Sequence, residues 1–217
     1  ICINSTADIG HDNLFVGNPT ECALLMAAVN KDWDYKKCRQ DADVVHVYPF
    51  SSEQKDMTTM VAENNKFIAY TKGSPEKILQ SCNLTQEQRK EIEEQITSYQ
   101  KKACRMIAFS HREFDKKTDW IQSEVETDMI FDGFTAIVDP LREDVYQAVK
   151  DCRVAGINIK IMTGDNIITA TAIANELHLL DDNHIALEAK EIEAMTDDKL
   201  IEKLPKISVI ARSTPTV

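Results

Sequence analysis

The sequence predicts two domains of different class: an α+β domain over residues 1–132, followed by part of an α/β domain over residues 133–217. In the first part, strand-forming runs follow one another across short turns, a pattern typical of an antiparallel sheet that carries helices. From about residue 133, strands alternate with helices, which favours a parallel sheet with helices on its faces. A chain of 217 residues is long enough for two such domains.

The first domain is expected to contain a helix that begins directly after Asn18. Asn18 can cap the helix, and Pro19 suits the first helical position. Glu21 follows the cap by three residues, where an acidic side chain can complete a capping box. These three residues together predict the start of the helix.

The rest of the first domain is expected to form strands joined by turns and two helices. Strand-forming residues occupy 44–50, 57–62, 67–72, 105–111 and 128–138. Asn64-Asn65 is expected to form a hairpin turn. One helix should start at Ser74-Pro75, and Thr85 with Gln88 has the capping-box pattern of a longer one.

In the second domain, strands and helices are expected to alternate along the chain. The predicted elements are a strand at 134–139, a helix at 142–155 ending at Gly156, a strand at 157–162, a helix at 166–178, and short strands at 184–187 and 207–211 with a helix between them.

Composition excludes several classes of function. The chain has 25 basic and 36 acidic side chains, a net charge of −11, so nucleic acid and direct contact with an anionic membrane are disfavoured. No apolar run approaches the roughly 20 residues needed to span a bilayer. The six cysteines contain no C-x-x-C pair and the five histidines show no ligand spacing, so a Cys or His metal site is not expected. A chain of this size can form a core without disulfides, which favours a reduced, cytosolic compartment. Because the chain does not begin with Met, we expect it to be a piece of a larger protein.

Thr163, Gly164 and Asp165 stand between a predicted strand and a predicted helix. Ligands of open α/β sheets bind at such junctions, a glycine allows a tight turn, and the N–H groups of a helix start suit anions. The alternative is that Thr163 or Asp165 only caps the helix. On the tetrapeptide Thr163-Gly-Asp-Asn166 alone, that alternative is favoured.

Three further positions could contact an anion or a flat ring. Lys72, whose strand ends at Gly73, can reach a phosphate or carboxylate as a point charge, but taken alone a solvated strand-end lysine is the more common case. Phe50 could stack on a base, but taken alone a core residue that closes a strand is the favoured alternative. Arg105 could pair with a ligand anion or with a nearby acidic side chain.

Taken in order, seven segments resemble successive motifs of P-type cation-transporting ATPases across nearly the whole chain. They are G-N-P-T-E-C-A-L-L at 17–25, V-Y-P-F-S-S-E-Q-K-D-M at 47–57, Y-T-K-G-S at 70–74, C-R-M-I-A-F at 104–109, D-P-L-R at 139–142, M-T-G-D-N at 162–166 and I-A-R-S-T-P-T at 210–216. The likeness is greatest to calcium ATPases of the calmodulin-regulated plasma-membrane class. It implies a nucleotide-binding domain followed by part of a haloacid-dehalogenase-like phosphorylation domain.

The resemblance also implies a role for individual residues. Phe50 would stack on adenine, Glu21 would contact the adenine edge, and Lys72 with Gly73 would line the floor of the pocket. Lys55 and Arg105 would lie toward the phosphates. In the phosphorylation domain, Thr163, Gly164 and Asp165 would face ATP, Arg212 would approach the nucleotide, and Asp139 with Arg142 would lie at the domain junction.

The sequence also departs from the family pattern. It contains neither D-K-T-G-T, which carries the phosphorylated aspartate, nor the T-G-D-G-x-x-D segment that helps hold Mg²⁺. Ser52 stands where several relatives have Arg, Gln54 replaces a basic residue, and Ser74-Pro75 replaces Ala-Ser. The loss of positive charge bears directly on phosphate affinity.

The resemblance implies that this chain binds ATP or ADP within a calcium pump that uses Mg²⁺ and forms an aspartyl phosphate. Its partners would be the transmembrane and actuator domains of the same pump, at the cytosolic face of the plasma membrane or of an internal calcium-storing membrane. By itself the chain should be inactive. The alternatives are a non-catalytic nucleotide-sensing or partner-binding module and a haloacid-dehalogenase-like phosphatase, for which no suitably placed nucleophilic aspartate is found.

Overall fold

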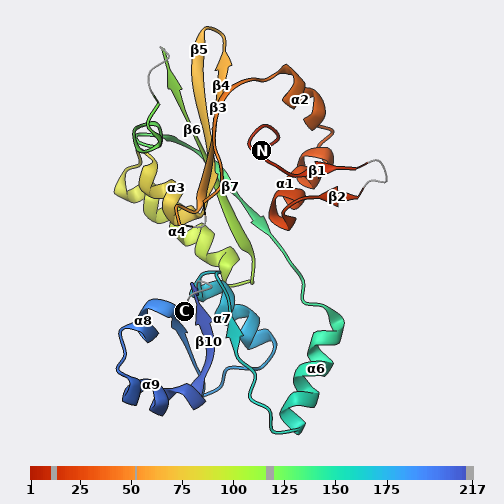
Figure 1. Cartoon of the computed structure of the whole chain (residues 1–217), viewed down its shortest axis with the longest axis vertical. Coiled ribbons are helices and arrows are strands. Elements are labelled where there is room, and N and C mark those ends of the chain that lie inside the picture. The colour runs from red at the N-terminus through yellow and green to blue at the C-terminus, as the bar shows by residue number, and fades with distance from the viewer. Residues whose placement is uncertain (11–13, 52, 116–119, 214–217) are drawn as a thin grey trace. The chain divides into compact units, whose positions relative to one another are not determined.

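The computed structural model describes residues 1–10, 14–51, 53–115 and 120–213. By its contacts the chain divides into two compact units (Figure 1). The first unit comprises Ile1–Ile92 and Met106–Ile137, and the second comprises Glu93–Arg105 and Val138–Val217, in each case for the described residues. Residues 93–105 thus group with the second unit, although the residues on both sides of them in the sequence belong to the first.

A five-stranded sheet forms the centre of the first unit. Its strands run in the spatial order β3 (Asp43–Tyr48), β4 (Asp56–Glu63), β5 (Lys66–Gly73), β6 (Arg105–Phe114) and β7 (Ile130–Ile137). The pairs β3–β4, β4–β5 and β5–β6 are antiparallel. Asn64 and Asn65 turn from β4 into β5 with φ of 49° and 66°, as a type I′ hairpin requires. The predicted antiparallel α+β fold is confirmed.

One face of this sheet carries the apolar core of the first unit. Because side chains alternate along a strand, Met60 of β4 and Ala69 of β5 point to the same side. They pack against Ile78 of α3 (Pro75–Ser81) and Val125 of α5 (Gln122–Val125). The longer helix α4 (Gln86–Gln100) follows α3 and begins with the predicted capping box, in which Thr85 and Gln88 exchange hydrogen bonds.

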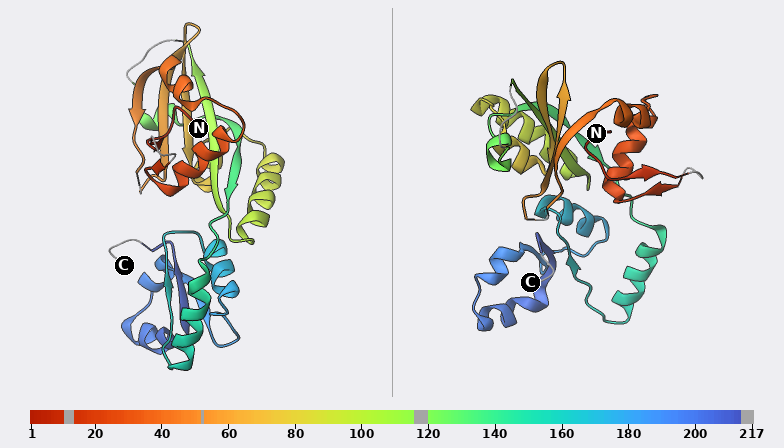
Figure 2. Two further views of the ribbon diagram at one scale, coloured as in Figure 1. Left: turned by 90° about the vertical axis from the view of Figure 1, so that its right-hand side faces the viewer. Right: turned by 45° about the horizontal axis from the view of Figure 1, so that its top comes forward.

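The opposite face is covered by the N-terminal segment and by two helices, α1 (Pro19–Val29) and α2 (Tyr35–Asp41), as Figures 1 and 2 show. The short strands β1 (Asp8–Ile9) and β2 (Phe15–Val16) form a separate pair. The predicted start of α1 is confirmed, because the Asn18 side chain accepts a hydrogen bond from the Thr20 N–H at 2.9 Å. A polar layer, described below, joins this cover to the sheet.

The second unit contains a parallel three-stranded sheet in the order β8 (Ile161–Met162), β10 (Ile207–Ala211) and β9 (Ile185–Glu188). Its helices are α6 (Glu143–Val154), α7 (Ile167–Glu176), α8 (Ala189–Glu193) and α9 (Asp197–Lys203), with a 3₁₀ turn at Leu204–Lys206. Val209 and Ala211 pack with Ala170 and Ala174 of α7 in a buried cluster. The predicted parallel domain is confirmed.

The structure differs from three local predictions for the second domain. The strand expected over 134–139 does not belong to the parallel sheet, because residues 134–137 are the end of β7 in the first unit. The strand expected over 157–162 is reduced to Ile161–Met162, because only these two residues find a partner strand, at Val209 and Ile210 of β10. The single helix expected between the last two strands is instead α8 and α9. Gly156 ends α6 as predicted, with a φ of 74° that favours glycine.

Candidate functional site

Glu21 and Lys72 form a buried ion pair in the first unit, although they are 51 residues apart in the sequence. Glu21 lies in the first turn of α1, and Lys72 lies on β5 with its side chain on the face opposite the apolar core. Lys72 Nζ donates to Glu21 Oε1 and also to the Asn4 carbonyl, at 2.6 Å. The two side chains are 11% and 8% exposed, so water screens this pair very little.

The second carboxylate oxygen of Glu21 is held by the segment before β1. Oε2 accepts hydrogen bonds from the Thr6 N–H at 2.9 Å, the Thr6 hydroxyl at 2.6 Å and the Ala7 N–H at 3.2 Å. Among the described residues, Glu21 therefore binds Thr6, Ala7 and Lys72 rather than closing a capping box with Asn18. The reason is that the helix start packs against the N-terminal segment, which offers three donors at once.

Burial and hydrogen bonding oppose each other at this pair. Burial by itself raises the pKa of Glu21, but the hydrogen bonds from Lys72 and Thr6 outweigh it, so the pKa lies below its usual value. Burial lowers the pKa of Lys72, and the hydrogen bond to Glu21 opposes part of that shift. The carboxylate is thus held charged, while desolvation works against the charge of the ammonium.

Phe50 lies just beyond the end of β3 and is 61% exposed. The alternative that it closes the core is therefore wrong, because its ring faces solvent. An exposed aromatic face at a strand end is available for stacking on a flat ligand.

Lys55 and Gly73 are brought together by the backbone. The Lys55 carbonyl accepts a hydrogen bond from the Ser74 N–H at 2.9 Å, and a Cβ added at Gly73 would lie 2.6 Å from the same oxygen. Only glycine fits this close approach, so Gly73 has a packing role in addition to its predicted place in the pocket. Lys55 itself has a φ of 61°, the left-handed region.

The departures from the family pattern have local structural consequences. Ser74 caps α3, with its hydroxyl accepting from the Lys77 N–H at 3.4 Å, and Pro75 takes the first helical turn. Gln54 is an exposed residue of the turn before β4. Ser52 lies outside the described residues. Ser74-Pro75 therefore serves to start a helix in this chain.

In the second unit, Asp165 accepts hydrogen bonds from two of the arginines predicted to lie at the site. Arg105 donates from Nη2 to both Asp165 carboxylate oxygens, at 3.1 and 3.2 Å, and the Arg212 N–H donates to the Asp165 carbonyl at 3.0 Å. Thr163 joins the same loop, because its hydroxyl accepts from the Asp165 N–H at 3.1 Å. The loop follows the carboxyl end of β8, the edge at which open α/β sheets bind ligands.

The structure corrects two local interpretations of this loop. Neither Thr163 nor Asp165 caps α7; Asn166 does, accepting from the Thr169 N–H at 3.0 Å. Gly164 is also not required for a tight turn, since its φ lies outside the left-handed region and an added Cβ would meet only the Ser213 carbonyl, at 3.7 Å.

Asp139 and Arg142 follow β7 directly, in the second unit, and both are exposed. Arg142 is the residue before α6 and donates to the Asp144 carboxylate from Nε at 3.0 Å and from Nη2 at 2.5 Å. The hydrogen bond to Asp144 raises the pKa of Arg142. Their role at a domain junction stays a prediction.

The residues described do not supply a magnesium site. Nowhere in ranges 1–10, 14–51, 53–115 and 120–213 do three or more His, Cys, Asp or Glu side chains come together so as to hold a metal ion. The carboxylate of Asp165, on the predicted ATP-facing loop, is paired with Arg105. Among the described helices, none is both long enough and apolar enough to cross a bilayer.

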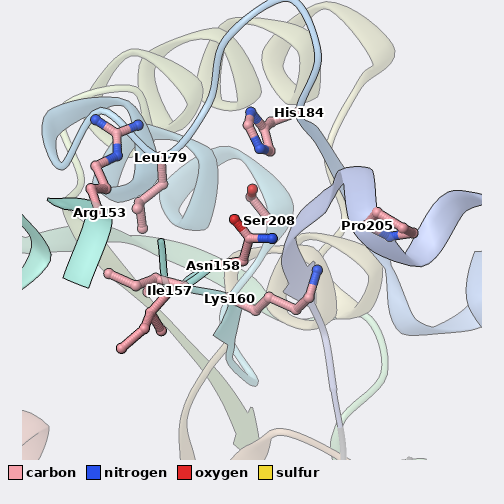
Figure 3. A pocket seen from close by; sticks show the side chains of 9 residues that line it. Arg153, Ile157, Asn158, Lys160, Leu179, His184, Pro205 and Ser208 are labelled. Atoms are coloured by element: carbon pink, nitrogen blue, oxygen red, sulfur yellow. The ribbon is translucent and has the colours of Figure 1, made fainter. Parts of the chain in front are cut away.

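A small hollow of about 70 Å³ lies in the second unit (Figure 3). Asn158 and Lys160 precede β8, His184 precedes β9, and Ser208 is near the start of β10, so the hollow lies at the amino ends of the parallel strands. The predicted ATP-facing loop is at the other edge. Lys160 extends toward Pro205 and donates to the Leu204 and Ile207 carbonyls. Its ammonium group therefore has hydrogen-bond partners within the second unit.

Sequence reasoning missed Asn4 and Thr6, which hold Lys72 and Glu21 in place. Both lie in a segment without helical or strand periodicity, and their partners are 15 to 68 residues away in the sequence. No local signal could have indicated these contacts.

Comparison with known proteins supports the resemblance in the sequence. Residues 1–144 match the family described as "P-type ATPase, cytoplasmic domain N". The chain is similar to calcium-transporting ATPase PAT1 of Dictyostelium discoideum, with 34% identity over 93% of this chain and 19% of that protein. It is also similar to calcium-transporting ATPase 2 of Schizosaccharomyces pombe (33% identity, 99% of this chain, 19% of that protein).

A plant relative shows the same extent of similarity. The putative calcium-transporting ATPase 13, plasma membrane-type, of Arabidopsis thaliana is 33% identical over 99% of this chain and 23% of that protein. The chain thus spans about a fifth of the length of these relatives. Since the N-domain match covers most of the chain, the protein described here belongs to the P-type ATPases.

Proposed function

We propose that the first unit binds the adenine nucleotide ATP or ADP, with Phe50 stacking on the base and Lys72 and Glu21 forming the polar part of the pocket. The observation that carries this proposal is the buried Glu21–Lys72 pair on the sheet face opposite the core. A lysine has three N–H donors, and two of them are used by Glu21 and the Asn4 carbonyl among the described residues. A third donor remains for a ligand.

We propose in the same way that the whole protein transfers the γ-phosphoryl group of ATP to an aspartate and uses the resulting acyl phosphate to transport calcium. The names of the relatives support calcium as the ion. The present chain would contribute positioning, which together with charge neutralisation is most of what phosphoryl transfer requires of a protein. Thr163, Asp165, Arg105 and Arg212 would approach the phosphates, at the cytosolic face of a multi-spanning membrane protein.

Calorimetric titration of the 217-residue chain with ADP tests nucleotide binding. Phe50→Ala should weaken binding by about 1–3 kcal/mol, the range for loss of one base–aromatic stack. Trp33→Ala is the matched control, because Trp33 is another exposed aromatic of the first unit, at 57%, without a proposed role. If Phe50→Ala binds ADP as tightly as the unchanged chain, Phe50 is not part of the site.

A further inference from the structure

Asn4 is a buried polar residue at the centre of the layer between the N-terminal segment and the sheet. The residue is only 3% exposed. Nδ2 donates to the Met57 carbonyl of β4 and the Tyr70 carbonyl of β5, both at 2.9 Å, and Oδ1 accepts from the Thr59 hydroxyl at 3.3 Å. Both amide donors and one acceptor position are therefore used, which leaves the side chain a single orientation.

The main chain of Asn4 contacts the proposed pocket directly. Its carbonyl accepts from Lys72 Nζ at 2.6 Å, and Thr6, two residues further on, donates twice to Glu21. The amide group of the same residue is fixed to two strands, which restricts the positions that this carbonyl can take. The Asn4 side chain thus determines where the acceptor for Lys72 lies, although it does not touch Lys72 itself.

We propose that Asn4 is a positioning residue for nucleotide binding: its side-chain amide fixes the carbonyl that aims the Lys72 ammonium, and with it the Glu21 carboxylate. The inference rests on the proposed function of Lys72 and Glu21. A purely structural alternative is that Asn4 only attaches the N-terminal segment to the sheet. The two differ in what they predict for Lys72, since only the positioning role links the Asn4 amide to the environment of the ammonium.

The test compares Asn4→Ala with the unchanged chain in two measurements. The first is ADP affinity by calorimetry, and the second is the titration of the Lys72 side chain by NMR, assigned with Lys72→Arg. We expect Asn4→Ala to bind ADP about tenfold more weakly, the factor for one lost buried hydrogen bond, and to shift the Lys72 titration. Ser110→Ala is the matched control.

Ser110 is a suitable control because it is buried in the same sheet but on the other face. It pairs with Thr71 in the β5–β6 register, next to Lys72, and donates to Met129 Sδ at 3.4 Å. Its loss should leave ADP affinity within twofold and the Lys72 titration unchanged, the scale of a site outside the working contacts. If Asn4→Ala does not fold, Asn4→Ser, which keeps one hydroxyl donor, serves for the same comparison.

The outcomes separate the inference from the proposed function. Failure of the unchanged chain to bind ADP would overturn the proposed function and this inference with it. Normal binding by the unchanged chain together with normal binding by the Asn4 variant would overturn the inference alone. Weaker ADP binding by the Asn4 variant, with the pKa of Lys72 unaltered, would assign Asn4 the structural role. That result would also overturn the inference.

Discussion

Lys72 on β5 and Glu21 at the start of α1 are each other's only oppositely charged partner in the first unit's polar layer, as far as the described residues show, and they join the helix to the sheet. The cost of removing water from both charges is offset only while both are present. A buried pair of this kind is therefore far more sensitive to loss of one member than to loss of both.

Lys72→Met should lower the free energy of unfolding by about 3–5 kcal/mol, because it leaves the Glu21 carboxylate buried and unpaired. Glu21→Gln combined with Lys72→Met should restore much of that loss. Urea unfolding followed by circular dichroism measures both. The exposed pair Lys66–Glu113 is the control, and Lys66→Met should cost much less. A loss in the double variant equal to the sum of the losses in Lys72→Met and Glu21→Gln alone would show that the two residues are not coupled.

The raised pKa of Asp56 predicts that the stability of the chain depends on pH. Burial, and then the charge of Glu126, raise the pKa of Asp56 from 3.8 to about 6, although Lys77 opposes the shift at 3.4 Å. Neither Asp56 oxygen has a hydrogen-bond partner among the described residues. The folded chain thus holds a proton that the unfolded chain releases at lower pH, so the contribution of Asp56 is fully present below 3.8 and is lost as the pH rises through about 6.

Asp56→Asn should accordingly be more stable than the unchanged chain above pH 6, by roughly 1–3 kcal/mol, and should approach it below pH 4. Chemical unfolding at a series of pH values measures the difference. Glu113→Gln is the control, and its change in stability with pH should have the opposite sign. The reason is that the hydrogen bond from Lys66 lowers the pKa of Glu113. A difference for Asp56→Asn that stays constant from pH 4 to pH 8 would contradict this prediction.

Gly73 and Gly164 should respond differently to the same substitution. Gly73→Ala places a Cβ 2.6 Å from the Lys55 carbonyl, a backbone atom that cannot move aside, and should destabilise the chain by about 1–3 kcal/mol. Gly164→Ala meets only an ordinary contact, at 3.7 Å, and should fold with nearly unchanged stability. Thermal unfolding of the two variants decides this, and an unstable Gly164→Ala would show that the loop is more crowded than its structure indicates.

Asp165→Asn should change the ADP affinity of this chain by less than about 0.5 kcal/mol, the usual scale for a position outside the working contacts. The proposed base pocket lies in the first unit, while Asp165 belongs to the second and contacts Arg105 there. Calorimetry with ADP measures the effect, with Phe50→Ala as the variant that must lose affinity. A tenfold loss on Asp165→Asn would mean that the second unit takes part in binding without D-K-T-G-T.

The chain should not form an acyl phosphate, because its sequence contains neither D-K-T-G-T nor T-G-D-G-x-x-D. Incubation with ATP labelled in the γ position, followed by hydroxylamine treatment, tests this at several Mg²⁺ concentrations. Hydroxylamine-sensitive label on the purified chain would show that another residue is the phosphate acceptor.

The sequence alone determined the two fold classes and most helix starts. These depend on neighbouring residues: Asn18 with Pro19, Thr85 with Gln88, and Asn64-Asn65 between two β-rich runs all acted as predicted. The order of the motifs was also readable, because it is a property of the chain and needs no coordinates. The family followed from it and was confirmed by comparison.

Only the tertiary structure decided which polar groups face one another. The Asn4 carbonyl reaches Lys72 across 68 residues of sequence, and Glu21 gives its carboxylate to Thr6 and Lys72 instead of a capping box. The strand expected over 157–162 shortened to the two residues that have a partner in β10. The physical reason is common to all three: hydrogen bonds across strands and segments depend on what packing brings near, whereas caps and turns depend on residues three or four positions away.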